Sequence, residues 1–171
     1  MINFFISGLP VPQPRQRVGM LNGHARTFTP KTLKRKDGSR KVNPIFTWKD
    51  AIALAAKPHV PAKPLEGPLD VSIRFYLPRP EAHYRSNGQL KDTAPYYHIG
   101  ARDRDNLDKA VLDILTNLKF WGDDGQVCDG RLTKFYANDG KTGADVTISL
   151  CDPTGRTRAV PIFELEKAPW E

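Results

Sequence analysis

Acidic side chains between positions 103 and 124 have the types and spacing of a divalent-metal centre that acts on a phosphate. Asp103 and Asp105 are separated by one residue, and side chains two positions apart in an extended segment point to the same side. Asp123 and Asp124 follow a helical pattern, and either of them would supply a further carboxylate. Because Mg²⁺ prefers oxygen ligands and keeps several waters, a few carboxylates are enough from a protein. The pattern therefore predicts a magnesium site.

Lys109 lies where it would act together with these carboxylates. Apolar residues recur at helical spacing over residues 106–118, which predicts an amphipathic helix with Asp105 as its N-cap. Lys109 points away from the apolar stripe and lies about one helical turn after Asp105. Its ammonium group would reach a phosphate held by the metal and offset charge that develops in the transition state. The stripe consists of Leu107, Ala110, Val111, Ile114, Leu115 and Leu118.

The same helix sets a geometric condition on the site. About 13 helical residues, each with a rise of about 1.5 Å, carry the chain ~20 Å away from Asp105. A short loop alone cannot reverse that displacement, so the tertiary fold must return Asp123 or Asp124 to the first pair. The predicted metal centre depends on this closure in space.

A purely structural interpretation of these residues stays open. Asp103 and Asp105 would then cap a helix, and Lys109 would form an ordinary i,i+4 ion pair with Asp113. The acidic pair at 123–124, followed by glycine, would be a plain turn. Taken one at a time, the features favour this interpretation, whereas their combination with a basic region favours a functional site.

Positive charge is concentrated in the N-terminal third of the 171-residue chain, which has a formal net charge of +7. Residues 1–60 contain eleven Lys or Arg but only Asp37 and Asp50, whereas later residues are slightly acidic in balance. Cationic clusters attract phosphate backbones and release counterions, so this region predicts a polyanionic partner. The alternative is a basic surface without a particular partner. The candidate phosphate-binding side chains are Arg15, Arg17, Lys31, Lys34, Arg35, Lys36, Arg40 and Lys41.

Several functional classes find no support in the composition. Cys128 and Cys151 are the only cysteines, too few for a disulfide framework or a four-cysteine zinc site. No apolar run approaches the roughly 20 residues that span a bilayer, and the first residues lack the pattern of a signal peptide. No glycine-rich loop precedes a Lys-Ser/Thr pair, so nucleotide hydrolysis is not indicated. We expect a cytoplasmic protein with no membrane partner.

The length predicts one domain over residues 1–171. Its N-terminal part begins with a strand at 3–7, which a series of prolines ends. Residues 27–43 are basic and poor in apolar side chains, so they predict a mobile arm that is ordered by a partner. A helix is expected at 44–56, and the prolines of 57–68 then form a stiff connector.

The C-terminal part adds further strands to the predicted sheet. Alternating apolar residues predict a half-buried strand at 69–77, and a long loop at 78–99 follows it. Residues 127–136 and 144–150 read as antiparallel strands joined by the turn signal Asn138-Asp-Gly. This order of elements predicts a small α/β domain with a mixed sheet packed by two helices.

At these residues the sequence resembles the RusA family of Holliday junction resolvases, which are small endodeoxyribonucleases common in prophages. The resemblance is carried by residues 103–115, Asp-Arg-Asp-Asn-Leu-Asp-Lys-Ala-Val-Leu-Asp-Ile-Leu, and by residues 120–129, Phe-Trp-Gly-Asp-Asp-Gly-Gln-Val-Cys-Asp. It extends to residues 6–17, which contain the pattern Gly-x-Pro-x-Pro followed by Arg-x-Arg, and to residues 27–31. The two central motifs are specific at their mutual spacing.

The resemblance implies a homodimer that depends on Mg²⁺, with Mn²⁺ as a substitute ion, and cuts four-way DNA junctions symmetrically. By motif position, Asp103, Asp105 and Asp124 would bind the metal, and Lys109 would be the catalytic lysine. Asp123 is a weaker candidate for the third carboxylate. The fold would be that of the family, with a basic N-terminal arm added to the α/β domain.

Other functions remain open. A DNA-binding protein without catalysis, whose carboxylates are structural, would have the same basic region. A nuclease with a broader preference for branched DNA would also fit, because the basic segment 27–43 and the loop 78–99 are longer than a minimal family member needs. Cleavage of a labelled junction in Mg²⁺ but not in EDTA separates the enzyme from the pure binder.

Overall fold

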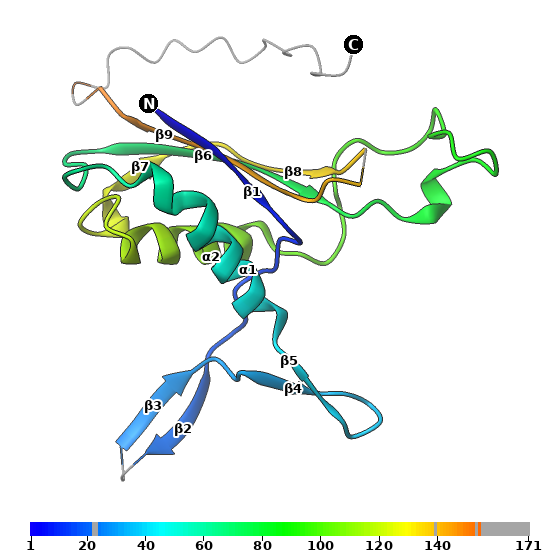
Figure 1. Cartoon of the computed structure of the whole chain (residues 1–171), viewed down its shortest axis with the longest axis horizontal. Helices are drawn as coiled ribbons and strands as arrows, with labels where there is room; N and C mark the ends of the chain where they lie inside the picture. The colour runs from blue at the N-terminus through cyan, green and yellow to red at the C-terminus, as the bar shows by residue number, and fades with distance from the viewer. Residues whose placement is uncertain (22–23, 139, 153, 155–171) are drawn as a thin grey trace.

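A computed structural model describes residues 1–21, 24–138, 140–152 and 154 of the chain. The fold is a five-stranded mixed sheet with both long helices on one face, and two hairpins project away from this body (Figure 1). The predicted α/β domain, with its mixed sheet and its pair of helices, is therefore confirmed. Among the described residues, no helix combines the length and the apolar character needed to cross a membrane.

Strand β6 (Leu69–Leu77) forms the centre of the sheet, within the bounds predicted from its alternating pattern. It pairs antiparallel with β9 (Gly143–Leu150), which in turn pairs antiparallel with β1 (Ile2–Ser7). On its other edge it pairs in parallel with β7 (Val127–Asp129) and β8 (Leu132–Tyr136). Every second side chain of β6 is buried under the helices, so this strand carries the middle of the core.

The predicted hairpin between residues 127–136 and 144–150 is wrong, because β6 lies between β8 and β9 in the sheet. The connection crosses the end of β6, where the Ala137 amide donates to the Leu77 carbonyl at 2.8 Å. The predicted strand 127–136 is also divided in two. Gly130, with φ of 150°, packs so closely on β6 that an added Cβ would collide with the Val71 carbonyl.

Helices α1 (Pro44–Ala56) and α2 (Arg104–Asn117) cover the inner face of the sheet. α1 has the predicted bounds, and the short helix η1 (Lys57–His59) follows it before the proline-rich connector. α2 begins earlier than predicted, so its N-cap is Asp103 and not Asp105. The core that the helices share with the sheet includes Ile6, Ile45, Trp48, Ile52, Leu107, Val111, Leu115, Phe120 and Trp121.

The two helices are also linked by an ion pair. Lys49 Nζ lies 3.5 Å from Asp113 Oδ2, so Asp113 pairs across to α1 and not with Lys109 along its own helix. Leu112 lies outside the apolar stripe of α2, yet it is half-buried and packs against the core. The i,i+4 pair between Lys109 and Asp113, which belonged to the purely structural interpretation, is therefore not formed.

The basic arm predicted at 27–43 contains regular structure, which begins before it, at Arg17, and which the sequence did not predict; we call residues 15–43 the basic arm. Strands β2 (Arg17–Leu21) and β3 (His24–Phe28) form one antiparallel hairpin, and β4 (Thr32–Lys34) and β5 (Arg40–Val42) form another. Most of their side chains are exposed, so backbone pairing and not a buried face holds the strands together. Hydrophobic periodicity could not reveal such strands.

Asn43 anchors the β4–β5 hairpin to the start of α1. This buried residue is the N-cap, and its Oδ1 accepts a hydrogen bond from the Ile45 amide at 3.2 Å. Its Nδ2 donates to the Pro30 carbonyl at 3.0 Å, and its backbone amide donates to the Lys31 carbonyl at 2.8 Å. One side chain therefore joins both ends of the hairpin to the helix.

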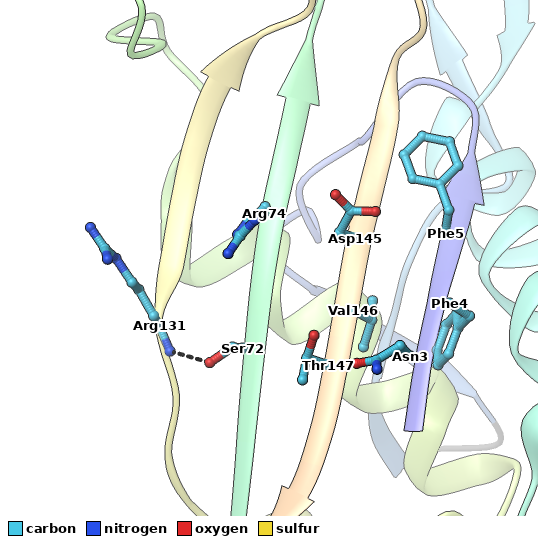
Figure 2. A pocket seen from close by; sticks show the side chains of 9 residues that line it. All are labelled: Asn3, Phe4, Phe5, Ser72, Arg74, Arg131, Asp145, Val146 and Thr147. Atoms are coloured by element: carbon cyan, nitrogen blue, oxygen red, sulfur yellow. Dashed lines mark hydrogen bonds between the residues drawn. The ribbon is translucent and has the colours of Figure 1, made fainter. Parts of the chain in front are cut away.

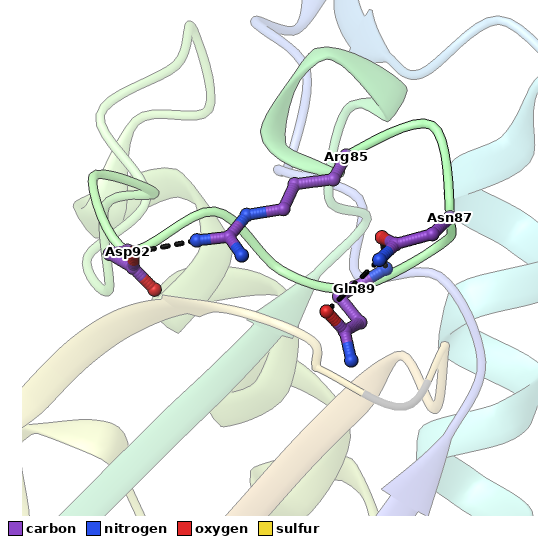
Figure 3. Close-up of polar contacts among 4 residues, drawn as sticks. All are labelled: Arg85, Asn87, Gln89 and Asp92. Carbon is purple, nitrogen blue, oxygen red and sulfur yellow. Dashed lines mark hydrogen bonds and ion pairs between the residues drawn. The ribbon is translucent and has the colours of Figure 1, made fainter.

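The long loop at 78–99 is ordered around a tight turn. It contains the short helix η2 (Glu81–His83), and its tip is Gly88, with φ of 81°. Arg85 pairs with Asp92 at 2.6 Å, and the Gln89 amide donates to Asn87 Oδ1 at 3.1 Å (Figure 3). The loop is therefore a folded protrusion with Gly88 at its tip.

The anchoring role of Asn43 is testable. We expect Asn43→Ala to lower the free energy of unfolding by about 1–2 kcal/mol, because the helix loses its cap and a buried amide bond. Urea denaturation measures the change. Ser39→Ala is the control, because the Ser39 hydroxyl bonds Asp37 in an exposed turn of the same hairpin. Equal losses in the two variants would contradict the assignment.

Candidate active site at the start of α2

Asp103 and Asp105 both lie at the N-terminal end of α2, and both are exposed. Asp103 is the N-cap in an extended conformation, yet its side chain makes no capping hydrogen bond. Asp105 already lies in the first helical turn, so the two residues do not share one extended segment as the sequence predicted. The positive end of the helix dipole therefore lies beside both side chains.

The proline-rich segment after β1 is attached to this end of α2. The Gln13 amide donates to the Asn106 carbonyl at 2.7 Å, and the Arg102 guanidinium donates to the Pro10 carbonyl. Gln13 is buried, so this contact is part of the packed body of the protein. Because Arg15 follows only two residues later, the basic arm starts beside the acidic pair.

The second acidic motif forms the start of the short helix η3 (Asp124–Gln126). Asp123 is its N-cap, and the Asp123 Oδ1 accepts a hydrogen bond from the Gly125 amide at 2.8 Å. This bond gives Asp123 a structural role. Asp124 is exposed and does not act as the cap, so it is the better of the two candidates for chemistry.

Gln126 holds this turn in place, a role that sequence reasoning missed. Its Oε1 accepts from the Gly122 amide at 2.9 Å and from the Asp123 amide at 3.2 Å. Its Nε2 donates to the Leu65 and Gly67 carbonyls, both at 3.1 Å, in the segment that leads into β6. The spacing Asp-x-x-Gln over residues 123–126 is a capping-box signal that would have revealed it.

Asp103, Asp105 and Asp124 do not form one cluster within a single chain. Among the described residues, no group of three or more His, Cys, Asp or Glu side chains is arranged to hold a metal ion. The closure on which the sequence argument depended is therefore not found in the isolated chain. A single chain brings together only Asp103 and Asp105, at the start of α2.

Lys109 is exposed on α2, one helical turn after Asp105. Because Asp113 pairs with Lys49, the Lys109 ammonium is not held by its i+4 neighbour. In the part of the chain that the structure describes, Lys109 forms no ion pair. Its charge is thus available to an anionic ligand on the outer side of the helix.

Asp108 lies on the same helix as the pair and is half-buried. Burial raises the pKa of its carboxyl to about 6, while Arg104 acts in the opposite direction. No motif or spacing in the sequence marks Asp108 out, because it lies between the apolar stripe and the polar face of the helix. Asp108 lines a hollow of about 270 Å³ together with Val71, Val127, Cys128, Asp129, Gly130 and Leu132.

The raised pKa of Asp108 has a consequence for stability. The folded protein holds a proton between pH 3.8 and about 6 that the unfolded chain releases, so this group favours folding at low pH and loses that effect as the pH rises through about 6. We expect Asp108→Asn to stabilise the protein by about 1–2 kcal/mol at pH 8, with allowance for solvent screening, and hardly at all at pH 4. Urea denaturation at both pH values measures this, and a larger gain at pH 4 would contradict it.

The candidate phosphate-binding residues are all exposed and lie on the two hairpins or next to them. Lys34 and Arg40 face each other across β4 and β5, so the second hairpin has a cationic cross-strand pair. A two-stranded ribbon of this kind fits the major groove of duplex DNA. Arg15 and Arg17 lie at the start of the first hairpin, Lys31 precedes the second, and Arg35, Lys36 and Lys41 complete the set.

The fold and these residues define a class of protein that comparison with known families identifies. Residues 7–149 match the family described as endodeoxyribonuclease RusA. This range covers most of the chain and contains both acidic motifs, Lys109 and the basic hairpins. The chain therefore belongs to the RusA family of endodeoxyribonucleases, which confirms the resemblance found in its motifs.

Individual relatives agree with this assignment to different extents. The chain is 30% identical over 146 residues to the uncharacterized protein YqaN of Bacillus subtilis strain 168, covering 81% of this chain and 89% of that protein. It is 51% identical over 39 residues to the crossover junction endodeoxyribonuclease RusA of Escherichia coli K12, covering 23% of this chain and 32% of the enzyme. The enzyme of Enterobacteria phage 82 matches to the same extent. The match to the named nucleases is thus confined to a short segment, about a third of their length.

Proposed function

We propose that this protein is a metal-dependent endodeoxyribonuclease that resolves four-way DNA junctions by paired phosphodiester hydrolysis. The observation that carries the proposal is membership of the RusA family over residues 7–149, together with the local match to proteins named crossover junction endodeoxyribonuclease. The geometry supports it, because an exposed acidic pair on α2 lies beside the start of a strongly basic arm. The Gln13–Asn106 hydrogen bond of 2.7 Å joins these two parts.

Asp103 and Asp105 would hold Mg²⁺, or Mn²⁺ in its place. Their carboxylates make no hydrogen bond or ion pair within the described residues, and oxygen donors are the ligands that Mg²⁺ prefers. Mg²⁺ is often bound by one or two carboxylates, waters and substrate phosphates, so the pair fits the ion. When bound, the ion would activate water for attack and stabilise charge on the phosphate. Asp124 would be a third ligand.

The protein's own groups would position the DNA for this reaction. The Lys109 ammonium would pair with a phosphate oxygen beside Asp105 and offset the charge that grows on it. The exposed amides at the start of α2 favour an anion at the same place. Cations of the hairpins would hold phosphates away from the cut and read bases weakly. In-line hydrolysis would leave 5′-phosphate and 3′-hydroxyl ends.

The chemistry is tested by Asp105→Asn. We expect this variant to cut a labelled four-way junction at least about 100-fold more slowly in Mg²⁺, because one ligand of the ion loses its charge. Junction binding in EDTA should remain as in the wild type. Asp113→Asn is the matched control on the same helix, since Asp113 pairs with Lys49 and not with the site. Full cleavage by Asp105→Asn would remove the metal-site proposal.

Where Asp124 acts is tested by mixing two variants. We infer a homodimer whose two centres are each completed by Asp124 of the partner, because one chain does not gather the three carboxylates. Asp105→Asn and Asp124→Asn should each be inactive. In their equimolar mixture about half of the dimers should contain one chain of each variant, and each of these mixed dimers has one intact centre. Nicking should therefore return at about a quarter of all centres.

The control is a mixture of Asp105→Asn with the double variant Asp105→Asn/Asp124→Asn. No dimer of these two chains has an intact Asp105, so the control mixture should be inactive. An inactive mixture of the two single variants would place Asp124 with Asp105 of its own chain, and cleavage by Asp124→Asn alone would place Asp124 outside the centre. The substrate is tested separately, by comparing junction, fork and duplex DNA in Mg²⁺ and in EDTA. Equal cleavage of all three would point to the broader branched-DNA nuclease, and no cleavage to the pure DNA binder.

A further inference from the structure

The outer face of the sheet has a chemistry that the proposed nuclease does not use. Both long helices lie on the inner face, and no described element covers the other one (Figure 1). Side chains of β1, β6 and β9 project from this outer face toward the same side (Figure 2). They line two adjoining hollows of about 560 Å³ and 260 Å³, which share Phe5 and Asp145.

A row of aromatic rings crosses this outer face from edge to edge. The ring centroids lie 6.4 Å apart for Phe5 and Tyr76, 5.9 Å for Tyr76 and Phe135, and 5.5 Å for Phe135 and Tyr97. Sheet register places these rings on one side, because Tyr76 pairs with Phe135 and Phe135 is bridged to Tyr97. The outermost rings are accessible, with Phe5 43% and Tyr97 51% exposed. An apolar row this accessible is suited to a ligand with flat faces.

The charges around the row are mainly positive. Arg74 and Arg131 line the larger hollow, and Lys141 lines the smaller one. Asp145 lies between them, opposite Arg74 in the sheet, and accepts a hydrogen bond from the Tyr76 hydroxyl at 2.8 Å. Burial, followed by this bond, raises the pKa of Tyr76 to about 12, so the phenol stays neutral. The acidic Asp70 lies at the far end of β6, away from the aromatic row.

Aromatic rings flanked by Arg and Lys form the arrangement that holds unpaired nucleic acid, since bases stack on the rings while phosphates pair with the cations. Duplex DNA fits less well, because its base faces are already stacked inside the helix. A second copy of the chain fits less well too. A symmetric contact would place two copies of this mainly positive face against each other, and like charges repel.

We propose that the outer face of the sheet binds single-stranded DNA, with bases stacked on Phe5, Tyr76, Phe135 and Tyr97 and phosphates held by Arg74, Arg131 and Lys141. This surface lies on the opposite side of the sheet from α2. It is a second DNA contact, independent of cleavage, and its ligand class is an unpaired strand of any sequence. The proposal does not rest on the nuclease activity, since binding can be measured without metal.

The test uses the full chain and a fluorescein-labelled oligo-dT strand of about 20 nucleotides in EDTA. Fluorescence anisotropy gives its dissociation constant and, with a separate label, that of a duplex. We expect Tyr97→Ala to weaken oligo-dT binding about tenfold and to leave duplex binding unchanged, because one stacking ring is lost. Tyr97→Phe should bind as the wild type does, since the ring and not the hydroxyl carries the contact.

Phe5→Ala repeats the test at the opposite edge of the row, and the melting temperature of each variant confirms folding. Lys34→Ala on the hairpin is the contrasting control, which should weaken duplex binding at least as much as oligo-dT binding. Unchanged oligo-dT affinity in both ring variants would overturn the proposal, as would an equal loss for both DNA forms. A change of sedimentation from dimer to monomer in Tyr97→Ala would also overturn it, because the face would then join two copies of the chain.

Discussion

The alternation of side chains along β6 is the constraint on which the rest of the structure depends. Leu69, Val71, Ile73, Phe75 and Leu77 are all buried, so one face of this strand must be covered by helices. Its backbone must also find partners on both edges, because an unpaired edge in the middle of a core would leave polar groups unsatisfied. β9 satisfies one edge, and β7 with β8 satisfies the other. The same alternation turns Ser72, Arg74 and Tyr76 outward, so the two faces of the protein acquire different chemistry from one strand.

The parts of the fold that could be predicted are those with a strong local pattern. β6 and α1 have the predicted bounds because their apolar residues repeat with the period of a strand and of a helix. The predicted hairpin between β8 and β9 is wrong, because a turn signal between two strands does not show whether they are neighbours in the sheet. The hairpins of the arm were not predicted, because their exposed side chains give no alternation of apolar and polar residues in the sequence. Backbone pairing and the buried amide of Asn43 give the arm its structure, and neither is visible as periodicity.

The candidate site could be predicted as a set of residues but not as an arrangement. Asp105 moves from the cap into the first turn of α2, and Asp123 takes part in capping η3. Both changes depend on where a helix begins, which sequence fixes only to within a few residues. The partner of Asp113 on α1 depends on helix packing, which a local pattern cannot contain. The spacing of residues in the sequence indicates which reaction they could support, whereas the fold determines which carboxylates lie close together.

The attachment of Gln13 to Asn106 also has a mechanical consequence. The segment before it is rich in proline, whose ring fixes φ, so the chain between β1 and the first hairpin cannot bend freely. Only residues 14–16 separate Gln13 from the start of the β2–β3 hairpin, so this hydrogen bond fixes the base of that hairpin next to Asn106. Any change in the direction of the hairpin therefore has its pivot in these three residues, beside the helix that carries Asp105 and Lys109.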